Sequence, residues 1–486
     1  MASVDLRTDL STLIDTVVGA ASAQADMSQL IAVARKYLKQ DKAVDVLIGR
    51  IGMIAAHGDT DGHPIMTLDS ASMLGRLAYW IPAPLDAQDA PKERLLPLFV
   101  QALKFAAPYV RQGIEAHAAQ KYPSPLFPSE LLDTGKSVND LMREAVAKSD
   151  ALLIERALLG LYGTGADYRT MQVRAYESIS NTFQNNGHPL MFAVRGFQLL
   201  DTVEWGNRAP NIINWLTPHL PLQPHTDEPA WIKTVRTFAA EQKHDLSVIR
   251  TRLSDPKDEN ALPLRAMILS DTDTTQVCQG VYDALVTNGA SAAGVASVIS
   301  LAAADVLQRV EESDHETFIH VAHGLLFTSA VHVIYQQVRD VEVLNLLYTA
   351  ACAINALHKA VSTKGVKPTQ QASKHVGAMG GLLAISLLET LEAEIKAQDI
   401  AAAANTAQRY LKLGHDPRAL FGTIGLATSL VDATVEQGHT LQIVQAASDE
   451  FLNWPRSLAN TNAEAFVQIA LRAAITGKRD TVVAGL

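Results

Sequence analysis

Apolar residues recur with a helical period along nearly the whole chain. In residues 190–203 (LMFAVRGFQLLDTV) and 440–452 (TLQIVQAASDEFL), apolar side chains return every three or four positions, which is the spacing of one face of an α-helix. We find no convincing run of alternating β-branched residues between hairpin turns, the pattern that predicts strands. The pattern therefore predicts an all-α protein.

Three breaks in this pattern are rich in Pro, Gly and Asp, and they lie at residues 121–132, 252–263 and 362–381. Such breaks mark loops between helical segments. They divide the chain into four pieces of similar length, 1–122, 123–255, 256–375 and 376–486. We interpret these pieces as four diverged helical units of about 120 residues, packed into one helical array.

A histidine recurs at the same phase in each unit. It lies in GHPIM (62–66), GHPLM (187–191), DHETF (314–318) and GHTLQ (438–442), at intervals of 125, 127 and 124 residues. Each histidine follows a short turn, an apolar helix of about 15 residues and a polar loop. The turns carry Gly165, Gly289 and Gly414, whereas the first unit has Asp41. Because Pro is favoured at the first helical position, the GHP histidines are expected at or beside a helix N-cap.

Two interpretations of this histidine stay open. It can be a loop and cap residue retained through duplication, or it can be a metal ligand. Four neutral imidazoles suit Fe, Zn, Cu or Ni better than Mg or Ca. A ligating histidine usually donates its other ring N–H to a carboxylate or a backbone carbonyl, and Asp69, Asp201 and Glu204 are the nearby carboxylates.

The third unit carries further histidines, His320, His323, His332 and His358. His320 and His323 are three residues apart and share a helix face. His332 follows His323 by nine residues and so points to the opposite side of the helix.

Composition and charge argue against some functions and do not alter the predicted all-α class. A net charge of −10 argues against binding nucleic acid or an anionic membrane surface. Cys278 and Cys352 lie in apolar segments with a helical period. We expect both to be buried free thiols in a reducing compartment. The N-terminal residues lack the pattern of a signal peptide, and the best candidate for a membrane span, residues 292–307, is interrupted by Asp305. We expect a cytoplasmic protein.

Common catalytic motifs are absent from the chain: GxGxxG after a strand, a phosphate-binding loop, HExxH and GxSxG. Two cysteines cannot form a Cys₄ zinc site or an iron–sulfur cluster. Any electrons used in a reaction must therefore come from an external redox partner.

Three segments carry a resemblance to a known family. GHPLMFAVRGFQLLD (187–201) resembles the His-Pro-Leu helix of the questin oxidase-like family. FIHVAHGLLFTSAVHVI (318–334) resembles that family's His-Ala helix, and also the all-helical domain that accompanies Rieske ferredoxin domains. GHTLQIVQAASDEF (438–451) resembles the terminal His-containing helix. The similarity is diffuse and spans roughly residues 40–480. Gln442 stands where family members often have Lys, and Glu155 and Arg156 replace part of a His-rich helix.

The resemblance implies a non-haem iron centre that oxidises polycyclic aromatic compounds. Its ligands would be His63, His188, His439 and either His323 or His315, since the repeat phase favours His315 and the resemblance favours His323. We therefore expect an oxidoreductase that uses iron or another divalent transition metal on a flat aromatic ketone- or quinone-type substrate. Four apolar side chains would line the substrate pocket: Met66, Met191, Phe192 and Phe197. The competing hypothesis is a non-catalytic helical-repeat scaffold, or a partner of a Rieske-type redox protein.

Overall fold

The computed structural model describes residues 27–38, 43–82, 93–119, 121–223, 228–242, 257–338, 341–362, 383–458 and 463–483. These ranges contain helices and no β-strand, apart from one isolated bridge between Val431 and Arg479, so the predicted all-α class is confirmed. The helices of the first half are α2 (Met27–Leu38), α3 (Val44–Ala55), α4 (His63–Ala78), α6 (Leu96–Ala119), α7 (Val138–Ala147), α8 (Ala151–Gly163), α9 (Tyr168–Ser178), α10 (His188–Val203), α11 (Ala209–Leu216) and α12 (Trp231–Glu241). Those of the second half are α14 (Leu262–Ile268), α15 (Thr274–Tyr282), α16 (Ala292–Gln308), α17 (His315–Gln337), α18 (Asn345–Ser362), α19 (Ala384–Lys396), α20 (Ile400–Lys412), α21 (Pro417–Thr428), α22 (His439–Leu452) and α23 (Glu464–Thr476).

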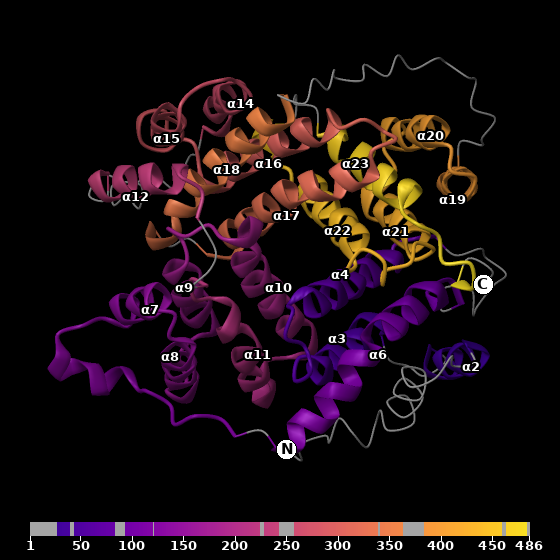
Figure 1. The fold of residues 1–486 in the computed structure, drawn as a ribbon. Coiled ribbons are helices and arrows are strands. Elements are labelled where there is room, and N and C mark those ends of the chain that lie inside the picture. Colours follow the sequence, from indigo (N-terminus) through magenta and orange to yellow (C-terminus); the bar gives the residue numbers. More distant parts are fainter. Residues whose placement is uncertain are drawn as a thin grey trace.

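Four helices surround the centre of the molecule, and each begins at one of the recurrent histidines: α4 at His63, α10 at His188, α17 at His315 and α22 at His439. α4 packs on α10, α10 on α17, α17 on α22, and α22 on α4 again, so the four helices close a ring. Figure 1 shows the indigo α4 beside the yellow α22. The first and last quarters of the chain therefore lie side by side.

Ion pairs and hydrogen bonds hold this closure. Lys104 of α6 lies 3.0 Å from an Asp432 carboxylate oxygen and 2.7 Å from one of Asp480. Deeper inside, Ser70 of α4 donates a 2.7 Å hydrogen bond to the Gln445 side chain of α22. Because Ser70 and Gln445 are fully buried, an unmade bond there would cost roughly 1–3 kcal/mol.

The helix that precedes each central helix starts from a similar local signal in three places. Gly165, Gly289 and Gly414 adopt φ of 70°, 77° and 76°, a conformation in which glycine has no steric penalty. Two residues later, Asp167, Ser291 and Asp416 accept a backbone N–H of the first turn of α9, α16 and α21, as favourable N-caps do. The equivalent first-unit turn at Asp41 lies outside the described residues.

A second set of glycines allows each central helix to begin in close contact with its neighbour. Gly62, Gly187 and Gly438 precede α4, α10 and α22 with φ of 92°, 85° and 74°. A Cβ on them would lie 2.4 Å from the Phe192 ring, 2.3 Å from the Phe327 ring and 2.2 Å from the Thr67 side chain, respectively. Each contacted residue belongs to the next helix of the ring and follows one of its histidines by four positions: Phe192 after His188, Phe327 after His323 and Thr67 after His63.

These matching turns agree with a repeat, but the division into four units stays a prediction. The boundary at 122/123 lies in a segment without secondary structure, whereas those at 255/256 and 375/376 lie outside the described residues.

The two cysteines are buried free thiols, as the sequence indicates, and their sulfur atoms lie 3.5 Å apart between α15 and α18.

The candidate membrane span differs from the one named above. Within the described ranges, α17 rather than residues 292–307 is long and apolar enough to cross a membrane. Its most apolar stretch is 72% buried inside the protein, which is where the core helix of a soluble protein lies.

The glycine contacts generate a stability prediction. Gly165→Ala should lower the free energy of unfolding by about 1 kcal/mol, because alanine is strained at a positive φ. No contact adds to this strain, since nothing lies within 4 Å of the new Cβ. Gly187→Ala should cost about 2–4 kcal/mol, because the clash with Phe327 adds to the strain. Urea unfolding of both variants measures the difference; equal losses would show that the approach of α10 and α17 is not tight.

Candidate metal centre

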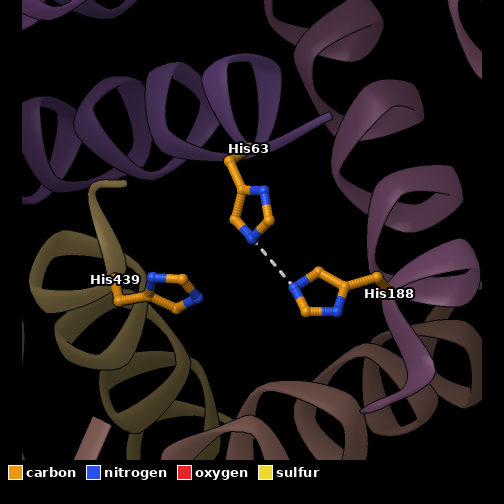
Figure 2. Close-up of side chains that lie close together, drawn as sticks. All are labelled: His63, His188 and His439. Carbon is orange, nitrogen blue, oxygen red and sulfur yellow. Dashed lines mark hydrogen bonds between the residues drawn. The ribbon is translucent and has the colours of Figure 1, made fainter. Parts of the chain in front are cut away.

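Four imidazole rings meet at the centre of the helical ring. His63, His188 and His439 stand at the first residues of α4, α10 and α22, and their side chains turn toward one another (Figure 2). Ligand nitrogens of these three residues all lie within 4.8 Å of one another. The fourth ring belongs to His323 of α17, whose centroid lies 5.0 Å from that of His188 and 4.7 Å from that of His439.

The closest contacts join Nε2 atoms in pairs. His188 Nε2 lies 2.9 Å from His63 Nε2, and His439 Nε2 lies 3.1 Å from His323 Nε2. The remaining neighbours, His63 and His439, have ring centroids 5.1 Å apart. The rings therefore follow the same cyclic order as the helices that carry them.

The Nδ1 atom of every ring faces an oxygen acceptor. His63 Nδ1 lies 3.0 Å from the Asp61 carboxylate, and His439 Nδ1 lies 2.6 Å from the Glu436 carbonyl. His188 Nδ1 contacts the Asn185 carbonyl, and His323 Nδ1 lies 3.0 Å from the His320 carbonyl and 3.1 Å from that of Ile319. Since these oxygens accept, Nδ1 carries the proton, and each Nε2 is left with a lone pair and no hydrogen.

Burial keeps the rings in this neutral form. His63, His188 and His439 are 7%, 3% and 5% exposed, while His323 is half-buried. Burial, reinforced by the neighbouring imidazoles, lowers the pKa of His188 to about 2 and those of His323 and His439 to about 4. Burial also lowers the pKa of His63, although Asp61 opposes the shift. A neutral imidazole is the form that binds metals.

The donor set fits a transition-metal ion. Four unprotonated nitrogens that face one another repel unless a cation lies among them. Bonds of about 2.0–2.2 Å to one four-coordinate ion place adjacent ligand nitrogens roughly 3.0–3.6 Å apart, close to the two Nε2 distances of 2.9 and 3.1 Å. Imidazole ligands without carboxylates suit Fe, Zn, Cu or Ni rather than Mg or Ca.

His315 does not join the rings. Although α17 begins at His315, its Nε2 lies 2.6 Å from Glu436 and its Nδ1 lies 2.9 Å from Thr476. The imidazole that reaches the centre is His323, about two turns further along the helix. Glu436 links the two positions, because its carboxylate faces His315 while its carbonyl faces His439 Nδ1.

Each ring Nδ1 faces a carboxylate or a backbone carbonyl, as expected, but none of the three candidate carboxylates is among these partners. Asp201 accepts the Trp205 indole N–H, and Asp69 lies near Gln445 and Arg195. Glu204 is an exposed residue at the end of α10. Asp61 and backbone carbonyls occupy the expected positions instead. Backbone carbonyl partners cannot be identified from the sequence, because every residue has a carbonyl. Asp61, two residues before His63, could have been considered from its position.

The residues expected to line a substrate pocket have mixed roles. Phe192 packs beside the rings of His63 and His188, with centroids 5.6 and 5.3 Å away. Phe197 lies elsewhere in the core, against Tyr176 and Trp205, and Met66 and Met191 are buried as well. His219, which the sequence did not single out, packs against Phe192 at 5.0 Å. Burial lowers its pKa to about 4.

The other third-unit histidines and the departures from the family pattern take structural roles. His332 lies between Glu450 and Ser297, at 2.9 and 3.2 Å, and His358 contacts Arg309. The Gln442 amide donates to Thr67 Oγ1 and to the Gln437 carbonyl. Glu155 accepts from Asn214, and Arg156 donates to the Ser124 carbonyl.

A second polar layer crosses the same four helices deeper in the core. It consists of Asp69 from α4, Arg195 from α10, His332 from α17, and Asp449 and Glu450 from α22. Arg195 lies 3.2 Å from Asp449 and 3.9 Å from Asp69. Burial raises the pKa of Asp69 to about 7, although Arg195 and Gln445 oppose the shift. Burial lowers the pKa of His332, but Glu450 more than compensates, and the net shift is upward.

Comparison of the chain with profiles of protein families, with curated proteins and with solved structures finds no match. The geometry of the four histidines is therefore the feature of this chain that points to a function.

The lowered histidine pKa values predict a pH-dependent stability for chelator-treated protein. A ring whose pKa lies below the unfolded value of about 6.5 is protonated more readily in the unfolded chain. Its stabilising contribution is complete above pH 6.5 and is lost as the pH falls toward the folded pKa. Between pH 7.5 and 5.5, the wild type should lose about 1 kcal/mol more stability than His188→Gln. Urea unfolding at both pH values measures this difference; identical losses would contradict the buried neutral ring.

Proposed function

We propose that the chain binds one divalent transition-metal ion, iron in the first place, through His63, His188, His323 and His439, and acts as a non-haem metal-dependent oxidoreductase. The observation that carries the proposal is the convergence of four Nε2 lone pairs whose Nδ1 partners are already satisfied. A histidine cluster that served only helix capping would have no reason to bring four such acceptors together.

The protein's own contribution is to orient the four ligands. The Asp61 carboxylate and the carbonyls of Asn185, His320 and Glu436 fix the tautomer of each ring. Partners of this kind raise the basicity of the ligand nitrogen and hold the ring plane. Phe192 shields two of the rings with an apolar surface. The ligands are thereby arranged before an ion arrives.

A histidine-bound iron ion supplies a redox-active Lewis acid. His63, His188, His323 and His439 would hold the ion, and the bound ion would supply the site at which a substrate or dioxygen is activated. The choice of a flat aromatic ketone- or quinone-type substrate depends on the resemblance to the questin oxidase-like family, as does the choice of iron. We further propose a cytoplasmic location and an external redox partner where the reaction needs electrons.

The first test is metal content. Wild-type protein purified without chelator should carry about one transition-metal ion per chain in elemental analysis, since four histidines form a single set. His188→Ala and His439→Ala should each lose most of this metal. His315→Ala is the matched control and should retain it, because His315 bonds Glu436 and Thr476 instead. A metal-free wild type that still refolds normally would favour the helical scaffold instead.

The second test is oxidation chemistry. Iron-loaded protein, supplied with a chemical reductant and a panel of hydroxylated anthraquinones, should consume dioxygen and convert at least one compound. His323→Ala should abolish the conversion, because it removes one of four ligands. Oxygen electrode traces with product analysis measure both. Full metal occupancy without any turnover would restrict the protein to metal binding.

A further inference from the structure

One face of α17 runs from solvent to the four-histidine centre. Glu316, His320, His323 and Phe327 follow one another at spacings of four, three and four residues, so they form a single stripe along the helix. Glu316 and His320 are exposed, His323 is half-buried, and Phe327 is 2% exposed. The stripe thus carries a carboxylate and an imidazole at the surface, then His323 of the four-histidine centre, then Phe327 in the core.

The other three rings are less accessible than His323. His63, His188 and His439 each sit at the first turn of a helix and are at most 7% exposed. His323 is therefore the one of the four rings that solvent reaches most readily. The His320 ring lies next on the solvent side, with its centroid 6.3 Å from that of His323.

We propose that Glu316 and His320 form an acquisition site that captures a hydrated divalent transition-metal ion and passes it to His323. This inference rests on the proposed metal centre. On capture, the Glu316 carboxylate oxygen and the His320 ring nitrogen would each replace one water molecule, which leaves the ion. On transfer, the four ring nitrogens would replace these two ligands and further water molecules, and no oxidation state changes. The ion passes from two protein ligands to four, so the transfer is favourable.

The geometry separates this role from that of a permanent ligand. His320 supports the centre through its backbone carbonyl, which faces His323 Nδ1, and that carbonyl remains when the side chain is removed. Loss of the His320 side chain should therefore change how fast the ion arrives and leaves, but not how tightly it is held. A negatively charged side chain near a cation-binding site can raise the association rate of the cation by about tenfold or more.

The experiment follows Co²⁺ uptake by chelator-stripped, full-length protein, using the visible absorption that appears when imidazoles replace water. His320→Ala should lower the second-order uptake rate by about tenfold, and Glu316→Gln should lower it less. The rate of Co²⁺ release to a chelator should fall by the same factor, because the equilibrium affinity is unchanged. His415→Ala, which removes a histidine on a distant turn between α20 and α21, is the control and should keep wild-type rates.

Each outcome has a defined meaning. Wild-type uptake and release rates in His320→Ala would overturn the acquisition site while leaving the metal centre intact. Reduced final stoichiometry or affinity would also overturn it, because His320 would then be a ligand of the centre. Failure of the wild type to bind Co²⁺ would remove the proposed metal centre itself.

Discussion

The convergence of four imidazole rings, three of them buried, is the constraint on which the rest of this structure depends. Neutral imidazoles that donate from Nδ1 present only an acceptor at Nε2, and two pairs of such atoms come within 2.9 and 3.1 Å of each other. Such an arrangement needs rigid support from outside. Each ring has that support, because its Nδ1 faces an oxygen from the same helix or from the loop that precedes it.

The shape of the surrounding fold follows from that support. For a first-residue histidine to face the centre, the chain before it must turn sharply, which the positive-φ residues Gly62, Gly187 and Gly438 allow. The same glycines admit a side chain of the next helix at a distance that no Cβ would tolerate. Local backbone chemistry and the spacing between helices are therefore fixed by the same residues. The third position departs from this rule: α17 is capped by the Asp314 side chain, and its contributing ring lies further along the helix.

Much of the fold could be predicted from the sequence, because helical periodicity is a local property. Glycine-turn signals and recurrent histidines also placed the starts of the four central helices. The site was harder to predict. The repeat predicted three of the four histidines at the centre. In the third unit the repeat phase favours His315, but the His315 side chain contacts Glu436 and does not lie among the other rings. Partners such as the carbonyls of Asn185 and Glu436 depend on backbone geometry, which residue identity does not encode. Metal binding itself stays a prediction.

The closure between α4 and α22 has a consequence for biosynthesis. His63 and His439 are separated by three quarters of the chain, and their contact depends on the last helices packing against the first ones. Contacts of such high sequence separation form late in folding, because a long loop must be closed before they contribute. A chain emerging from the ribosome would hold α4 with its buried polar side chains, Asp69 and Ser70 among them, without their partners on α22. The incomplete chain therefore brings together only part of the four-histidine cluster, and the cluster is completed when the last helices have been made.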